Sequence, residues 1–231
     1  MKLSRQSGRG LAFLFLLILW MSTAARANTT LRDEEISQCL PGEISTWGDG
    51  QDRAALSSPL VFVYNHALAP PWFDATLVQK AVQNAAQAWS QCGVPSKVLS
   101  WPAEAELRQG AILVQWSEQG SRRNFGLANL GERTLSLGPA AFDLLKARNP
   151  AFDSRQTLQM VISHEMGHLF GLMAHSRRCV DVTSYYNNGQ GGTCAIRGGG
   201  ALPGGVEYRS IMPTACDLQR CRIANGKPTT P

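Results

Sequence analysis

Apolar residues recur along much of this chain with one of two periods, and each period predicts a different element. After Asp74, which can cap a helix, apolar residues follow a helical spacing to about Gln91 and predict a helix with one buried face. A second helix is expected after Asp153, because Asp153 and Gln156 have the spacing of a capping box. The positions predicted to be buried are Leu77, Val78, Ala81, Val82, Ala85, Ala88 and Trp89 in the first helix, and Leu158, Val161, Ile162 and Leu169 in the second.

Five short β-prone stretches lie between and around these helices. They cover residues 60–64, 96–101, 111–116, 125–130 and 134–137. Strands and helices of this kind predict an α+β fold. The later part of the chain has a different composition, with eight glycines among residues 189–205, and predicts irregular structure there.

The first 27 residues have the features of a signal peptide. Three basic residues precede an apolar run of eleven residues, and Ala25-Arg26-Ala27 offers a cleavage site. The run is too short for a transmembrane helix, which needs about twenty apolar residues. We therefore expect an exported protein, secreted or periplasmic, that has no membrane anchor and begins at Asn28.

Removal of this segment changes the charge of the protein. It holds four of the 22 basic residues and none of the 17 acidic ones, so the net charge falls from +5 to 18 − 17 = +1. A nearly neutral chain gives no reason to expect nucleic acid as a partner. The remaining 231 − 27 = 204 residues suit one domain, and we expect a monomer.

Residues 28–58 are polar and rich in turn-forming residues, and we interpret them as an N-terminal extension or a short pro-segment before a domain at residues 59–231. Within this segment, residues 47–52 have a faint likeness to a calcium-binding loop but lack its ligand spacing and closing glutamate. We interpret them as a solvated turn, and leave a structural Ca²⁺ open.

Six cysteines follow the signal peptide, and an even number in an exported chain predicts disulfides. Fifteen pairings are possible. The pairings with short loops are Cys179–Cys194 and Cys216–Cys221, which leave Cys39–Cys92. The alternative is a second zinc ion held by the four late cysteines.

The residues with the clearest chemistry lie between positions 164 and 175. On a helix, His164 and His168 lie one turn apart on one face, where they can bind one zinc ion, and Glu165 beside them can act as a general base. Gly171 can end the helix, because it tolerates a positive φ, and His175 follows as a third imidazole. The alternative is a buried helix whose histidines are hydrogen-bonded core residues.

These residues, together with Ser210-Ile211-Met212, resemble the matrixin group of the metzincin clan of zinc peptidases. The resemblance covers residues 60–221, strongly in the metal region and loosely elsewhere. It implies a zincin fold: a twisted mixed sheet of about five strands, a backing helix, a metal-binding active-site helix and an irregular C-terminal part stapled by disulfides. It also implies that Met212 forms a turn beneath the zinc ion.

One departure from the family pattern concerns the third ligand. The family's third histidine falls three residues after the glycine, where this chain has Ala174, and His175 is one residue later. We expect His175 to complete the site, because imidazole is a common zinc ligand. The alternatives are Asp181, Glu207 and His66.

The resemblance also implies how a substrate would bind. Residues 125–130, with Gly126, Leu127 and Ala128 at their centre, are the candidate edge strand that pairs with an extended peptide, although a plain hairpin strand is an equal alternative. We expect Gly126 to let the substrate backbone approach closely. Residues 212–216 would form the wall of the pocket beside the zinc ion, and Tyr208 is a weak candidate for transition-state support. Residues 92–95 match the centre of the family's cysteine switch, which we interpret as coincidence because they end a helix inside the domain.

The sequence therefore predicts an exported zinc endopeptidase that acts on protein or peptide substrates. Zinc held by His164, His168 and His175 leaves a fourth position for a water molecule, and Glu165 accepts the proton of that water. Two other functions stay open: an inactive exported zinc-binding or adhesion module on the same scaffold, and a metal-assisted hydrolase that acts on a non-peptide amide or ester.

Overall fold

The computed structural model describes residues 31–150, 153–202 and 207–228, and within these ranges it is built around one mixed sheet. The strands are β1 (Leu60–Asn65), β2 (Ser96–Ser100), β3 (Ile112–Trp116), β4 (Gly126–Asn129) and β5 (Thr134–Leu137), in the order β2-β1-β3-β5-β4. The first four in this order run parallel, and β4 pairs antiparallel with β5 at one edge. The prediction of a mixed sheet of about five strands is confirmed.

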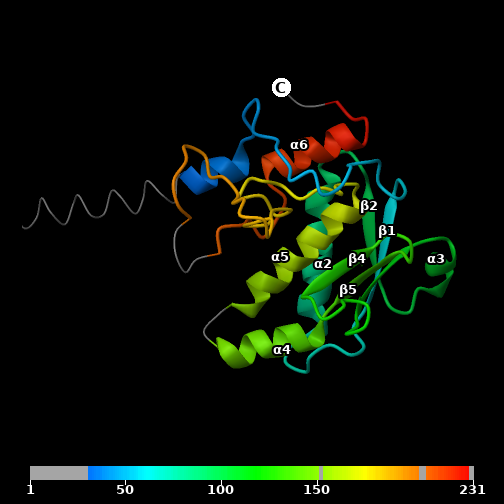
Figure 1. The fold of residues 1–231 in the computed structure, drawn as a ribbon. Coiled ribbons are helices and arrows are strands. Elements are labelled where there is room, and N and C mark those ends of the chain that lie inside the picture. The colour runs from blue at the N-terminus through cyan, green and yellow to red at the C-terminus, as the bar shows by residue number, and fades with distance from the viewer. Residues whose placement is uncertain (1–30, 151–152, 203–206, 229–231) are drawn as a thin grey trace, which may run out of the picture.

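Two long helices pack on each other and on the sheet (Figure 1). The helices are α2 (Ala75–Ser90), α3 (Glu104–Arg108), α4 (Pro139–Arg148), α5 (Ser154–Leu169) and α6 (Ala215–Ala224), and residues 31–37 are also helical. Helix α2 contacts β2, and α5 contacts β4 and β5. Helix α5 therefore lies beside the open edge of the sheet.

Helices α2 and α5 begin where the sequence predicts. The carboxylate of Asp74 accepts a hydrogen bond from the backbone N–H of Leu77 (3.0 Å), and Asp153 accepts from the N–H groups of Arg155 and Gln156. The reciprocal bond of a capping box is found instead on α6, between Thr214 and its third residue.

The core beneath α5 is aromatic and fixes the position of that helix relative to α2 and β1. Trp89 of α2 is fully buried and donates its indole N–H to the carbonyl oxygen of Ser163 in α5 (2.8 Å). Phe170, which follows α5, stacks between Trp89 and Phe62 of β1. The helix that carries the histidines is therefore held by rigid side chains, as an accurately placed site requires.

The six cysteines form three disulfides: Cys39–Cys216, Cys92–Cys221 and Cys179–Cys194. The predicted Cys179–Cys194 bond is confirmed, and the other two predicted pairings are wrong. Cys216 and Cys221 both lie on α6, where residues five apart point to different sides and their Cα atoms are about 9 Å apart, beyond the reach of a disulfide. Since every cysteine is paired, none is available as a thiolate for a second zinc ion.

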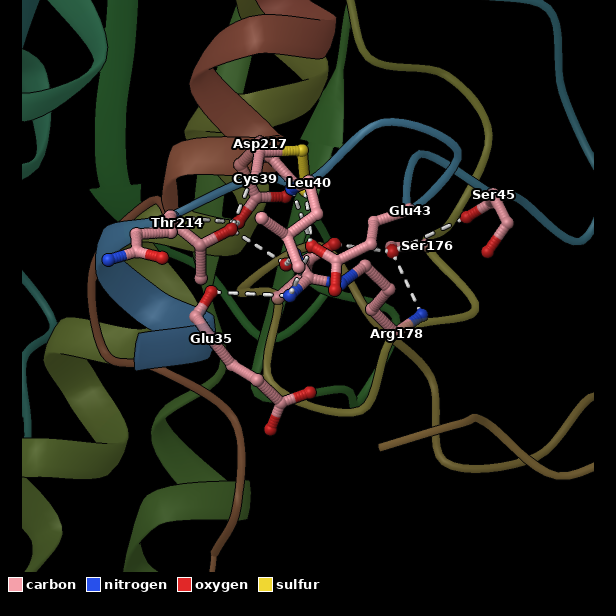
Figure 2. Close-up of a disulfide and its surroundings, with 12 residues drawn as sticks. Glu35, Cys39, Leu40, Glu43, Ser45, Ser176, Arg178, Thr214 and Asp217 are labelled. Atoms are coloured by element: carbon pink, nitrogen blue, oxygen red, sulfur yellow. Dashed lines mark hydrogen bonds and ion pairs between the residues drawn. A yellow bond between two sulfur atoms is a disulfide. The ribbon is translucent and has the colours of Figure 1, made fainter. Parts of the chain in front are cut away.

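Two disulfides tie helix α6 to other parts of the chain, Cys39–Cys216 to the N-terminal segment and Cys92–Cys221 to the residues after α2, and Cys179–Cys194 closes a loop after α5. Figure 2 shows the bond at Cys39 beside Thr214 and Asp217 at the start of α6, with Arg178 from the loop after α5 close by. Arg178 pairs with Glu43 (3.5 Å) from the N-terminal segment.

In the described ranges no helix is long and apolar enough to cross a bilayer. The predicted signal peptide lies outside these ranges.

Candidate metal centre

Helix α5 ends in a tight turn, after which the chain runs back toward the last turn of this helix. Gly171 has φ +107°, and a Cβ atom there would lie 2.0 Å from the carbonyl oxygen of Arg53. Only glycine combines this backbone conformation with so close an approach. The chain therefore turns back, and the ring of His175 lies 5.2 Å from that of His164 and 5.0 Å from that of His168, measured between centroids.

The three histidines present one ring nitrogen each toward a common point. These nitrogens lie within 4.8 Å of one another. The Nδ1 atom of His164 is 2.8 Å from the carbonyl oxygen of Val182, and that of His168 is 2.6 Å from the carbonyl oxygen of Leu172. Because a carbonyl oxygen only accepts hydrogen bonds, Nδ1 carries the proton in both rings and Nε2 carries a lone pair.

His175 follows the same rule with a different partner. Its Nδ1 atom is 2.6 Å from a carboxylate oxygen of Asp49. Among the described residues, its Nε2 atom is buried and has no hydrogen-bond partner. A buried nitrogen with a lone pair and no donor nearby fits the role of a metal ligand. The donor set fits zinc, which three imidazoles and one open position commonly bind.

Burial keeps all three imidazoles neutral. It lowers the pKa of His164 well below its usual value and that of His168 to about 4, and nearby histidines lower both further. Burial also lowers the pKa of His175, although Asp49 opposes this change. Neutral imidazoles do not have to lose a proton to bind a metal ion.

Glu165 lies beside the histidines with its carboxylate directed to the edge strand. One carboxylate oxygen accepts a hydrogen bond from the backbone N–H of Ala128 (2.8 Å). Burial raises the pKa of Glu165 to about 7, and the hydrogen bond from Ala128 limits the rise. A carboxyl group with a pKa near neutrality can both accept and return a proton.

A cleft of about 580 Å³ contains the three histidines and Glu165, and β4 forms one of its walls. The strand predicted at residues 125–130 is therefore found as β4, at one edge of the sheet and beside the metal centre. The close approach of a substrate to Gly126 stays a prediction, and the structure gives a second reason for a glycine here. A Cβ atom there would lie 2.6 Å from Val161 and 2.8 Å from Glu165, so Gly126 makes room for α5.

The extra residue before His175 is accommodated within the turn. Ala174, which occupies the family's position for the third histidine, is buried. Its backbone N–H donates to Asp52 (3.2 Å), and its carbonyl oxygen accepts a hydrogen bond from Arg220. Both backbone groups of Ala174 are therefore satisfied, and the following residue is free to face the metal centre.

The three alternative ligands lie outside the cluster formed with His175. Asp181 is buried and forms an ion pair with Arg178 (3.0 Å). Glu207 forms an ion pair with the arginine two residues later (2.9 Å). His66, which follows β1, bonds to the hydroxyl of Tyr64 on that strand (2.6 Å).

The region around Met212 only partly matches what the resemblance implies. The sulfur of Met212 is 3.6 Å from the hydroxyl of Ser163, the neighbour of His164, which places the methionine against the metal helix. Of the described residues, Arg209 and Tyr185 line this side of the cleft, and residues 212–216 do not. The prediction that residues 212–216 form the pocket wall is therefore wrong.

The tyrosine in the cleft is Tyr185, not Tyr208. The hydroxyl of Tyr208 donates to Glu35 (2.6 Å) in the buried N-terminal part. The ring of Tyr185 stacks on that of His175, with 3.7 Å between centroids. Both tyrosines follow the metal helix, and nothing local in the sequence distinguishes them.

Two aspartates of the N-terminal segment contribute to the metal centre, although the sequence predicts only a solvated turn there. The carboxylates of Asp49 and Asp52 bind the loop that carries His175. Burial raises the pKa of Asp49, but hydrogen bonds from His175 outweigh it and hold the pKa below its usual value. No sequence signal links positions that are 126 residues apart.

Comparisons with known proteins add little to this description. No protein-family model and no curated protein matches the chain. Among solved structures, a chain of the "GM1 bound form of the ECX AB5 holotoxin" is similar at 14% identity and a TM-score of 0.39, covering 71% of this chain and 80% of that one. Archaemetzincin from Methanopyrus kandleri is similar at 18% identity and a TM-score of 0.35, covering 56% of this chain and 82% of that one. At these scores neither likeness carries an argument about function.

Proposed function

We propose that this protein is an exported zinc-dependent endopeptidase of the matrixin-like, metzincin type. One observation carries the proposal: three imidazoles with protonated Nδ1 atoms converge within a cleft that also holds the carboxylate of Glu165. Three disulfides support an oxidising compartment. Protein or peptide is the substrate class, because one wall of the cleft is an open strand edge.

His164, His168 and His175 would hold the zinc ion through their Nε2 atoms. When bound, zinc acts as a Lewis acid that polarises a carbonyl group and lowers the pKa of water. Glu165 would accept a proton from the attacking water and return it to the leaving nitrogen. The backbone N–H of Ala128 holds the Glu165 carboxylate in place for this transfer.

The pairing of β4 indicates which of its backbone groups point away from β5, where the proposed substrate would bind. The N–H of Gly138, just after β5, donates to the carbonyl oxygen of Phe125, just before β4, so these two residues form a hydrogen-bonded pair. In an antiparallel ladder such pairs alternate, so Leu127 also bonds to β5 while Gly126 and Ala128 face outward. Because Glu165 already binds the N–H of Ala128, an extended peptide would pair mainly with Gly126 and with the carbonyl oxygen of Ala128.

The test is to measure zinc content and peptidase activity in the Glu165→Gln variant. We expect the variant to keep its zinc and to cleave a denatured protein about 10²- to 10⁴-fold more slowly, since it lacks the general base. Glu132→Gln is the matched control, because Glu132 is exposed on the turn between β4 and β5. Equal activity of Glu165→Gln and the wild type would refute the role of Glu165.

The same assay separates the alternatives. Wild-type protein that binds zinc but cleaves no substrate would be a zinc-binding module. Turnover of small esters or amides without cleavage of peptides would indicate a hydrolase of another class. A chelator should abolish activity in either catalytic case.

A further inference from the structure

The N-terminal segment at residues 45–53 lies along the loop that carries His175. The N–H of Trp47 donates to the carbonyl oxygen of His175 (3.0 Å), and the N–H of Arg177 donates to that of Ser45 (2.9 Å). Further along, the N–H of Arg53 donates to the carbonyl oxygen of Gly171 (3.0 Å). Backbone hydrogen bonds therefore join the two segments on both sides of the third histidine.

Asp52 holds the part of the loop that contains the extra residue. One of its oxygens accepts from the N–H groups of Met173 (2.8 Å) and Ala174 (3.2 Å). Its other oxygen pairs with Arg220 of α6 (2.5 Å), which also donates to the carbonyl oxygen of Ala174. The N-terminal segment and the C-terminal helix thus fix the turn between them.

Asp49 holds the third histidine itself. One carboxylate oxygen accepts from the backbone N–H of His175 (2.9 Å), and the other bonds to Nδ1 of its ring (2.6 Å). One side chain therefore sets both the backbone position and the ring orientation of His175. His164 and His168 instead use carbonyl oxygens from the chain that follows them.

We propose that Asp49 is a positioning residue that fixes His175 as the third metal ligand, and that residues 45–53 are a permanent part of the metal centre rather than a removable pro-segment. The inference rests on the proposed zinc site. A carboxylate on the far nitrogen of a ligand histidine fixes its tautomer and increases its basicity, and loss of such a partner typically weakens metal binding 10- to 100-fold. The contact of Asp49 with His175, in addition to that of Asp52 with the turn, compensates for the longer spacing before His175.

The test compares zinc affinity in Asp49→Ala and Asp33→Ala, measured by competition with a chelator. Asp33 is exposed in the helical segment at residues 31–37, so its variant controls for the loss of one negative charge. We expect zinc affinity to fall about 10- to 100-fold in Asp49→Ala and to stay unchanged in Asp33→Ala. An unchanged affinity in Asp49→Ala, or an equal fall in both variants, overturns the inference.

A second readout separates positioning from general destabilisation. Correlation spectra of the ¹⁵N-labelled imidazoles in metal-free protein report which ring nitrogen carries the proton. We expect His175 to be protonated at Nδ1 in the wild type and to show both tautomers in Asp49→Ala, with His164 and His168 unchanged. A His175 ring that keeps its single tautomer without Asp49 overturns the inference.

The Asp49→Asn variant decides the question if Asp49→Ala does not fold. An asparagine has one acceptor oxygen for two donors, so it can serve either the backbone N–H or the ring of His175, and we expect an intermediate loss of zinc affinity. If the wild type binds no zinc, the proposed function fails, while the tautomer spectra still decide whether Asp49 positions His175.

Discussion

Replacement of Gly126 by alanine tests how closely the edge strand and the metal helix are matched. A Cβ atom at this position would lie 2.6 Å from a methyl carbon of Val161, 2.8 Å from Cγ of Glu165 and 3.3 Å from one of its carboxylate oxygens. The first two distances are shorter than any relaxed carbon–carbon contact, so either β4 or the Glu165 side chain must move.

The expected size of the effect follows from these contacts. One added methyl group in a packed site costs about 1–3 kcal/mol in unfolding free energy. A shift of Glu165 would also weaken its hydrogen bond with Ala128 and misplace the carboxylate. Because a misplacement of about 1 Å can cost about 10²-fold in rate, we expect kcat/KM to fall by about 10- to 100-fold while zinc stays bound.

The assay is peptide cleavage by Gly126→Ala, with zinc content and thermal unfolding measured on the same sample. Gly131→Ala is the matched control, since a Cβ atom there meets only Asn129 at 3.5 Å, an ordinary contact. Full activity of Gly126→Ala, or an equal loss in Gly131→Ala, would refute the packing argument. Loss of zinc from Gly126→Ala would show that the histidines, not Glu165, absorb the strain.

Two further predictions concern stability. In metal-free protein the pKa of Glu165 is raised from 4.5 to about 7 by burial, so the folded state binds more protons than the unfolded state between these values. The contribution of Glu165 to stability should therefore fall by up to about 3 kcal/mol as pH rises from about 4.5 to about 7, while the three histidines, whose pKa values are lowered by burial, contribute in the opposite direction. The difference in stability between the wild type and Glu165→Gln isolates the Glu165 contribution, and parallel pH curves for the two proteins in thermal unfolding with chelator would contradict it. Joint replacement of Cys39 and Cys216 by serine should lower the unfolding free energy by about 2–4 kcal/mol in denaturant titrations and weaken zinc binding, because it frees the chain before residue 45. The Cys179–Cys194 pair, replaced in the same way, should affect zinc binding less, and equal zinc affinities in all three proteins would refute that link.

The metal helix could be predicted from the sequence because its determinants are local. His164, Glu165 and His168 lie within one turn, Asp153 caps the same helix, and Gly171 ends it. The same holds for the strands, whose β-prone residues are contiguous. The sheet and its edge strand followed from these short-range patterns.

The features that the sequence did not predict depend on contacts between distant positions. The pairing of Cys39 with Cys216 spans 177 residues, and the bond between Asp49 and His175 spans 126. A preference for short loops fails in such cases, since the folded chain, not sequence separation, decides which side chains meet. The close contact of Gly126 with α5 was not predicted for a related reason, because Val161 and Glu165 lie far from Gly126 in the sequence.

The turn that holds Ala174 between Asp52 and Arg220 has a consequence for biosynthesis. A ribosome releases Asp52 168 residues before Arg220, so this clamp cannot close until α6 has left the ribosome. We expect nascent chains and fragments truncated before α6 to lack hydrolytic competence. The proposed peptidase would therefore stay inactive until α6 has docked.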